Sequence, residues 1–150
     1  MSTFLMIYAS MSGNTEGIAK LIEEGIVEAG GRVELKEIMD ATPQDLLDYE
    51  GILLGSYTWG DGELPDEFLD FYEDMNNLDL SGKKVAVFGS GDHAYIHYCA
   101  AVDILETKVK ELGAELVQGG LKIEMSPYGP EVEECKNFGK RFASQFLGIK

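Results

Sequence analysis

Most residues of one short segment near the start of the chain carry a hydroxyl, an amide or no side chain. The segment reads Ser10-Met11-Ser12-Gly13-Asn14-Thr15. It lies between an apolar run and a helical pattern, so its hydroxyls and backbone N–H groups converge where the helix dipole favours negative charge. It contains no Lys or Arg and lacks the Gly-Lys-Ser/Thr of a triphosphate-binding loop. The pattern therefore indicates neutral donors for a phosphate monoester, and simple helix capping by Ser12, Asn14 and Thr15 is the alternative.

Two further loops are rich in aromatic residues. The first carries the only tryptophan and comprises Tyr57, Thr58, Trp59, Gly60, Asp61 and Gly62. The second holds Ser90, Gly91, Asp92, His93, Tyr95, His97, Tyr98 and Cys99. A flat aromatic face at a loop tip is suited to stack on a planar ligand, although a tryptophan can also plug the end of a sheet. Two aromatic loops beside one phosphate loop predict a planar ligand with a phosphate tail.

The elements that position these loops follow from hydrophobic patterning. Apolar runs rich in β-branched and aromatic residues predict strands over 3–9, 32–38, 51–57, 83–89 and 115–123, the last interrupted at Gly119-Gly120. Helical patterns cover 15–29, 66–75, 100–112 and 132–146, with a helical turn at 44–47. This alternation predicts a parallel sheet with helices on both faces. No linker or repeat divides the chain, so residues 1–150 are expected to form one α/β domain, with ligands beyond the carboxyl ends of the strands.

The charge balance limits the classes of partner. The chain has 12 Lys and Arg residues against 27 Asp and Glu residues, which gives a formal net charge of −15. The phosphates of nucleic acids and anionic membranes would be repelled, so neither is expected as a partner. Basic protein surfaces are the natural counterpart, and acidity that serves only solubility is the alternative.

Neither the cysteines nor the histidines suggest a metal site. Cys99 and Cys135 lie far apart with no CxxC spacing, which also favours a reducing compartment. His93 and His97 fall in a loop, and no glutamate follows His93. The dinucleotide pattern at residues 89–94 follows the fourth predicted strand, and no helix begins at its end. The N-terminal apolar run is too short to span a bilayer and no basic stretch precedes it, so we expect a cytoplasmic protein.

The three loops together resemble the flavodoxin family. The phosphate loop of that family reads Ser/Thr-x-Thr-Gly-x-Thr, which residues 10–15 match with Ser12 in place of the middle threonine. The similarity continues through residues 101–103 and 112–115 and covers essentially the whole chain. No long loop is inserted in the fifth predicted strand, as in the short-chain class. The resemblance implies a doubly wound, five-stranded parallel sheet of order 2-1-3-4-5 and non-covalently bound FMN.

The resemblance also implies a role for each loop. Residues 10–15 would hold the phosphate of FMN, and the isoalloxazine ring would lie between Trp59 on its inner face and Tyr95 on its solvent side. The Gly60-Asp61 peptide would turn over on one-electron reduction, which glycine permits at little conformational cost. The expected cofactor-binding residues are Ser10, Met11, Ser12, Gly13, Asn14, Thr15, Tyr57, Thr58, Trp59, Gly60, Asp61, Gly62, Ser90, Gly91, Asp92, Tyr95, His97, Tyr98 and Cys99.

The function implied by this resemblance is a low-potential one-electron carrier that cycles mainly between semiquinone and hydroquinone. Acidic residues near the ring would oppose the second electron; they are Asp61, Glu63, Asp66, Glu67 and Asp92. The expected partners are an NAD(P)H-dependent flavodoxin or ferredoxin reductase and electron-accepting redox enzymes, each met through basic surfaces. The sequence shows no base or nucleophile for a substrate, so we expect a monomeric carrier and not an enzyme.

Two other functions are possible on a similar fold. A flavin-dependent NAD(P)H:quinone oxidoreductase would normally add loops for nicotinamide and dimer contacts, for which this chain has little spare length. A phosphoacceptor receiver domain requires an aspartate at the end of the third strand and an acidic pair after the first. Those places hold Ser56-Tyr57 and Ala9-Ser10.

Overall fold

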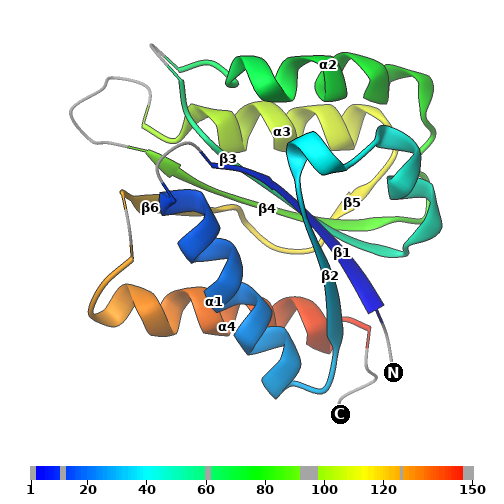
Figure 1. Cartoon of the computed structure of the whole chain (residues 1–150). Coiled ribbons are helices and arrows are strands. Elements are labelled where there is room, and N and C mark those ends of the chain that lie inside the picture. Colours follow the sequence, from blue (N-terminus) through cyan, green and yellow to red (C-terminus); the bar gives the residue numbers. More distant parts are fainter. Residues whose placement is uncertain (1–2, 11–12, 60–61, 92–97, 126, 147–150) are drawn as a thin grey trace.

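A twisted parallel sheet forms the centre of the molecule (Figure 1). The computed structural model describes residues 3–10, 13–59, 62–91, 98–125 and 127–146. The strands are β1 (Thr3–Ala9), β2 (Arg32–Glu37), β3 (Gly51–Tyr57), β4 (Lys84–Gly91), β5 (Glu115–Leu116) and β6 (Leu121–Glu124). All pair in parallel, in the order β2-β1-β3-β4-β5, and β6 also pairs with β4. The predicted order 2-1-3-4-5 is confirmed.

Helices cover both faces of this sheet. The helices α1 (Asn14–Glu28) and α4 (Pro130–Ser144) lie on one face, while α2 (Asp66–Asp74) and α3 (Ala100–Glu111) lie on the other (Figure 1). Short 3-10 helices complete the chain at η1 (Ile38–Asp40), η2 (Pro43–Asp48) and η3 (Met75–Asn77). None of the helices in the described part of the chain combines the length and apolar character that a bilayer crossing requires.

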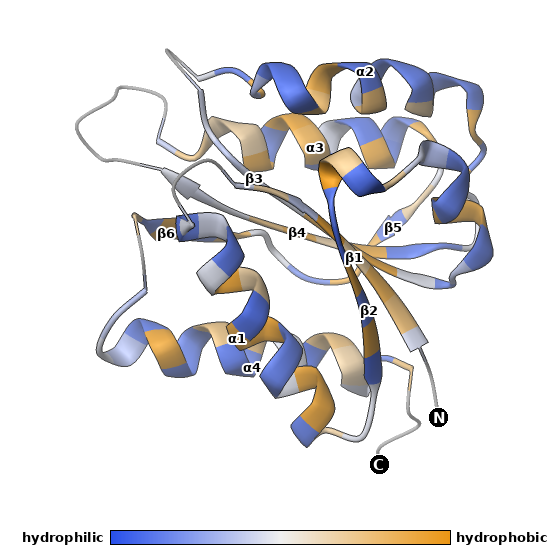
Figure 2. Ribbon diagram, viewed as in Figure 1, coloured by the Kyte–Doolittle hydropathy of each residue, from blue (hydrophilic) through white to orange (hydrophobic). Residues whose placement is uncertain are grey.

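The two faces of the sheet build two separate hydrophobic cores, because successive side chains of a strand point to opposite sides. In β1, Leu5 and Ile7 join the core under α2 and α3, whereas Phe4 and Met6 join the core under α1 and α4. Every residue of β1 from Phe4 onward is buried, as expected for a strand covered on both sides. Figure 2 shows this hydrophobic character along the central strands, with hydrophilic residues on the outer surfaces of the helices.

Element ends differ slightly from those predicted, for physical reasons. Helix α4 begins at Pro130 and not at residue 132, because proline at the first helical position has no N–H to lose there. Strand β4 extends to Gly91 and not only to residue 89, because it pairs with β6 up to Glu124. Strand β2 ends at Glu37, since Ile38 starts a 3-10 helix.

The fifth position of the sheet is divided between two short strands. β5 pairs with the beginning of β4 and β6 with its end, and the predicted break at Gly119-Gly120 separates them. A Cβ atom on Gly120 would lie 2.6 Å from Val102 and 2.9 Å from a carboxylate oxygen of Glu106. The Gly120 backbone also donates a hydrogen bond to Glu106. Helix α3 therefore packs against the segment between β5 and β6.

Helices α1 and α4 approach each other closely through two glycines. A Cβ atom on Gly25 would lie 2.0 Å from the Lys136 carbonyl oxygen, and one on Gly139 would lie 2.2 Å from the Ile22 carbonyl oxygen. Contacts this short with backbone atoms cannot be relieved by rotating a side chain. The two glycines therefore set the distance between the helices.

The variant Gly25→Ala tests this contact. Because its methyl group would push α1 away from α4, we expect the free energy of unfolding to fall by about 2 kcal/mol, as measured by urea denaturation. Gly17→Ala on the same helix is the matched control, since nothing lies within 4 Å of that position. The control should gain up to about 1 kcal/mol from helix propensity. Equal stabilities of the two variants would contradict the close-packing argument.

The half-buried carboxyl group of Glu106 should make stability depend on pH. Burial, and next the charge of Asp103, raise the pKa of Glu106. Protonation therefore favours the folded state, so the contribution of this group is present at low pH and is lost as the pH rises through its folded-state pKa. We expect Glu106→Gln, which keeps an acceptor for Gly120, to melt at a higher temperature than the wild type at pH 7. The difference should vanish below about pH 4.

The exposed variant Glu111→Gln changes the net charge equally on the same helix. A similar rise in its melting temperature would mean that net charge, and not burial of Glu106, causes the effect.

Candidate cofactor-binding site

Ser10, the residue after β1, is hydrogen-bonded to the beginning of α1. Gly13 takes a left-handed conformation with φ of 90° immediately before the helix. The Ser10 Oγ atom accepts hydrogen bonds from the Gly13 N–H at 3.1 Å and from the Glu16 N–H at 3.3 Å. Both bonds use lone pairs of this oxygen, so the hydroxyl proton of Ser10 can be donated to an anion. Together with the positive end of the helix dipole, this arrangement suits a phosphate group.

A buried hydroxyl pair joins this loop to the end of β4. The Thr15 Oγ1 and Ser90 Oγ atoms lie 2.8 Å apart, and either can be the donor. Both residues are buried. One of the two hydroxyl protons serves this bond, and the other can be donated to a neighbouring acceptor. Thr15 therefore does more than cap its own helix, since its side chain links two of the three predicted ligand loops.

The tryptophan loop is a narrow hairpin at the end of β3. The Trp59 N–H donates to the Glu63 carbonyl at 2.7 Å, and the Glu63 N–H donates to the Trp59 carbonyl at 2.9 Å. Gly62 has a φ of 102°, a conformation that glycine adopts more readily than other residues. Trp59 itself is 46% exposed. The side chain is therefore not a plug at the end of the sheet, and its ring has surface available to a planar ligand.

Two side chains fasten the base of this hairpin to neighbouring helices. The Thr58 Oγ1 atom accepts a hydrogen bond from the Ala101 N–H, at 3.2 Å, at the start of α3. The Tyr57 hydroxyl donates a hydrogen bond to the Glu67 carboxylate in the first turn of α2. Burial, and next the hydrogen bond to Glu67, raise the pKa of Tyr57. These two side chains position the loop, and no pattern in the sequence indicated either partner.

Cys99 occupies the start of α3 with its side chain in the core. Its φ of 51° is unusual for a residue other than glycine. The Sγ atom lies 3.9 Å from the Gly89 carbonyl oxygen and 3.8 Å from the Ile123 carbonyl oxygen. Burial raises the pKa of the Cys99 thiol to about 11. The side chain of Cys99 thus belongs to the core, and a contact of this residue with a ligand stays a prediction.

A close contact explains the glycine at the end of β4. A Cβ atom on Gly91 would lie 2.9 Å from both the nitrogen and the Sγ atom of Cys99. Tyr98 follows the second aromatic loop and is half-buried, and burial is the main cause that raises its pKa. Gly91 and Cys99 thus lie in contact at the end of β4, with Tyr98 next to them in the chain, and their role in binding stays a prediction.

Several of the predicted residues lie outside the described part of the chain. They are Met11, Ser12, Gly60, Asp61, Asp92, Tyr95 and His97, and His93 also lies outside it. Among the side chains that the structure does describe, no group of three metal-ligating residues is arranged to hold an ion. The described donors are hydroxyl and backbone N–H groups, and an exposed indole ring lies at the same edge of the sheet. This donor set fits a phosphate monoester attached to a planar ring system.

Comparison with known proteins agrees with the geometry of this edge. The family model described as flavodoxin matches residues 6–139. The chain belongs to the flavodoxin family. Flavodoxins bind FMN and carry electrons, and this chain is of the short-chain type.

Individual relatives are similar over nearly their full lengths. A Bacillus subtilis protein named "Probable flavodoxin 2" is 53% identical over 146 residues, which cover 97% of each chain. The flavodoxin of Maridesulfovibrio salexigens is 41% identical and is matched over 97% of this chain and 99% of its own length. The crystal structure of oxidised Flavodoxin 2 from Bacillus cereus has a TM-score of 0.93 at 55% identity and covers 97% of this chain and 100% of its own.

The hydroxyl pair at the phosphate loop provides a test of the site. The variant Thr15→Val keeps the shape of the side chain but removes its hydroxyl group. We expect the dissociation constant for FMN to rise about tenfold, because roughly 1.4 kcal/mol of hydrogen bonding is lost. Quenching of FMN fluorescence by the apoprotein measures this constant. Thr107→Val, at an exposed position of α3, is the control, and equal affinities of the two variants would count against a ligand role for Thr15.

Proposed function

We propose that residues 1–150 form one FMN-binding domain that transfers single electrons at low potential between protein partners. The observation that supports this function is the pairing of neutral phosphate donors with an exposed indole ring at one edge of the sheet. Ser10, Thr15 and Ser90 supply hydroxyl donors for the phosphate, and Trp59 supplies an aromatic face for the flavin ring. The other predicted binding residues, within 10–15, 57–62 and 90–99, are proposed to contact the phosphate and the ring of FMN as well.

Negative charge near the ring would set the potential. Glu63, Asp66 and Glu67 lie within eight residues after Trp59, and Asp66 and Glu67 are in the first turn of α2. A unit charge at about 10 Å with an effective dielectric constant near 20 contributes about 1.7 kcal/mol before screening. Adding the electron that makes the flavin anionic is therefore costly, and the lower of the two potentials falls. Flavin supplies the redox chemistry, while the chain holds it and adjusts its potential.

The partners follow from the same charge. A surface with a formal net charge of −15 attracts basic proteins and repels nucleic acids and anionic membranes. We propose an NAD(P)H-dependent flavodoxin or ferredoxin reductase as the electron donor and redox enzymes as acceptors, each with a basic docking face. The carrier is proposed to be a cytoplasmic monomer without substrate turnover of its own.

A redox titration tests the proposed function. The purified protein should be yellow and should take up two electrons in two separate steps when reduced gradually under nitrogen and followed by absorption. NADPH alone should not bleach it, because the chain has little spare length for a loop that binds nicotinamide. Uptake of both electrons in one step, or rapid bleaching by NADPH alone, would contradict a one-electron carrier.

Salt should weaken the encounter with a basic partner. We expect the rate of reduction by a basic reductase, measured by stopped-flow absorption, to fall at least tenfold between about 0.01 and 0.5 M salt, because screening shortens the range of attraction. The potentials should be measured over the same range as a control. A rate that does not change with salt would remove electrostatic steering from the proposal.

A further inference from the structure

Exposed apolar side chains gather where β6 ends. Met125 is 50% exposed and Tyr128 is 79% exposed. Gly91 of β4 pairs with Glu124 of β6, and the Met125 N–H donates to the Gly91 carbonyl oxygen at 2.8 Å. Met125 is therefore fixed beside the residue from which the chain enters the second aromatic loop.

Tyr128 also lines a hollow in the surface. The hollow is lined by Glu124, Tyr128, Pro130 and Glu131. Pro130 and Glu131 begin α4, and the Glu131 Oε1 atom accepts a hydrogen bond from the Tyr128 N–H at 3.4 Å. The first turn of the helix thus orders the segment that carries the tyrosine.

The lining of this hollow favours an organic cation. Carboxylates form charge-assisted hydrogen bonds with guanidinium and ammonium groups, and the face of a tyrosine ring attracts the same cations. The exposed Met125, which follows Glu124 in the chain, adds flexible apolar contact area, which suits surfaces that bind other proteins. Tyrosine is among the residue types that contribute most of the binding energy at protein interfaces, and methionine is enriched in the buried centre of such interfaces.

We propose that Met125, Tyr128 and this hollow form a docking surface for a redox partner that presents a lysine or arginine among apolar side chains. This inference rests on the proposed function. The net charge of −15 steers a basic partner toward the protein, and the hollow accepts its cationic side chain. Docking here places the partner next to Gly91, the last residue of β4. In the complex the partner's redox centre gains the single electron that FMN loses, and no covalent bond forms.

Binding to ferric cytochrome c, a strongly basic haem protein, tests the surface. Both proteins are used in their oxidised forms, so that no electron moves and titration calorimetry reports docking alone. We expect Met125→Ala and Tyr128→Ala each to raise the dissociation constant about tenfold. Met125 has a left-handed backbone with φ of 54°. Alanine and methionine both carry a Cβ atom, so the steric cost of this conformation is similar for the two residues.

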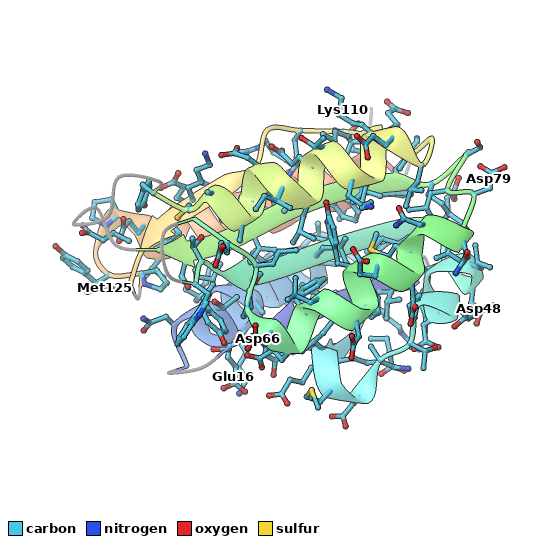
Figure 3. The ribbon with its side chains drawn as sticks, turned by 90° about the horizontal axis from the view of Figure 1, so that it is seen from above. Glu16, Asp48, Asp66, Asp79, Lys110 and Met125 are labelled. Atoms are coloured by element: carbon cyan, nitrogen blue, oxygen red, sulfur yellow. The ribbon has the colours of Figure 1, made fainter. Side chains whose placement is uncertain are left out.

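Leu47→Ala is the matched control. Leu47 is 45% exposed and precedes Asp48, which lies at the opposite end of the molecule from Met125 (Figure 3). This variant should bind cytochrome c like the wild type. If Met125→Ala and Tyr128→Ala also bind like the wild type, the docking surface is refuted.

A second measurement needs no variant. Ferric haem broadens nearby nuclear magnetic resonance signals, so the methyl signal of Met125 should broaden on addition of cytochrome c while those of Leu47 stay sharp. Equal broadening of both would also refute the surface. Failure of the proposed function is distinguishable, because it would appear in the redox titration of the wild type and not in docking between oxidised proteins.

Discussion

The buried hydrogen bond between Thr15 and Ser90 joins the phosphate loop to the end of the central strand β4. A ligand that reaches from one loop to the other needs their separation to be fixed. Glycine at position 89 lets β3 and β4 lie close together here, because a Cβ atom on Gly89 would lie 2.5 Å from the Ser56 carbonyl oxygen. The hydroxyl pair can thus hold the two loops together at the place where a ligand would bind.

The aromatic hairpin is held in a similar way, by bonds at its base. Paired backbone bonds close it between Trp59 and Glu63, Thr58 joins it to α3, and Tyr57 joins it to α2. Such bonds reduce the ordering that ligand binding would otherwise require. The indole ring can therefore remain exposed without depending on core packing for its position.

Charge imposes an opposite constraint on the same edge. A chain with a net charge of −15 repels a phosphate dianion, yet the predicted phosphate loop contains no lysine or arginine. Local dipoles must provide the attraction, and the start of α1 with the Ser10 hydroxyl is placed to do so. Figure 3 shows the acidic residues Glu16 and Asp66 on the same side of the molecule as each other. The proposed site would thus combine short-range attraction for an anion with a negatively charged surface around it.

The sequence by itself determined the element types, the parallel character of the sheet and the neutral phosphate loop, because each follows from local periodicity or from chemistry at one helix end. The break at Gly119-Gly120 was visible for the same reason. The strand order came from the resemblance to the flavodoxin family, and the structure confirms it. Only the tertiary structure decided that Thr15 bonds to Ser90, that the side chain of Cys99 lies in the core, and that Gly25 contacts α4. Those contacts join residues that are distant in the chain, and they arise when whole helices pack on the sheet, so no local pattern encodes them.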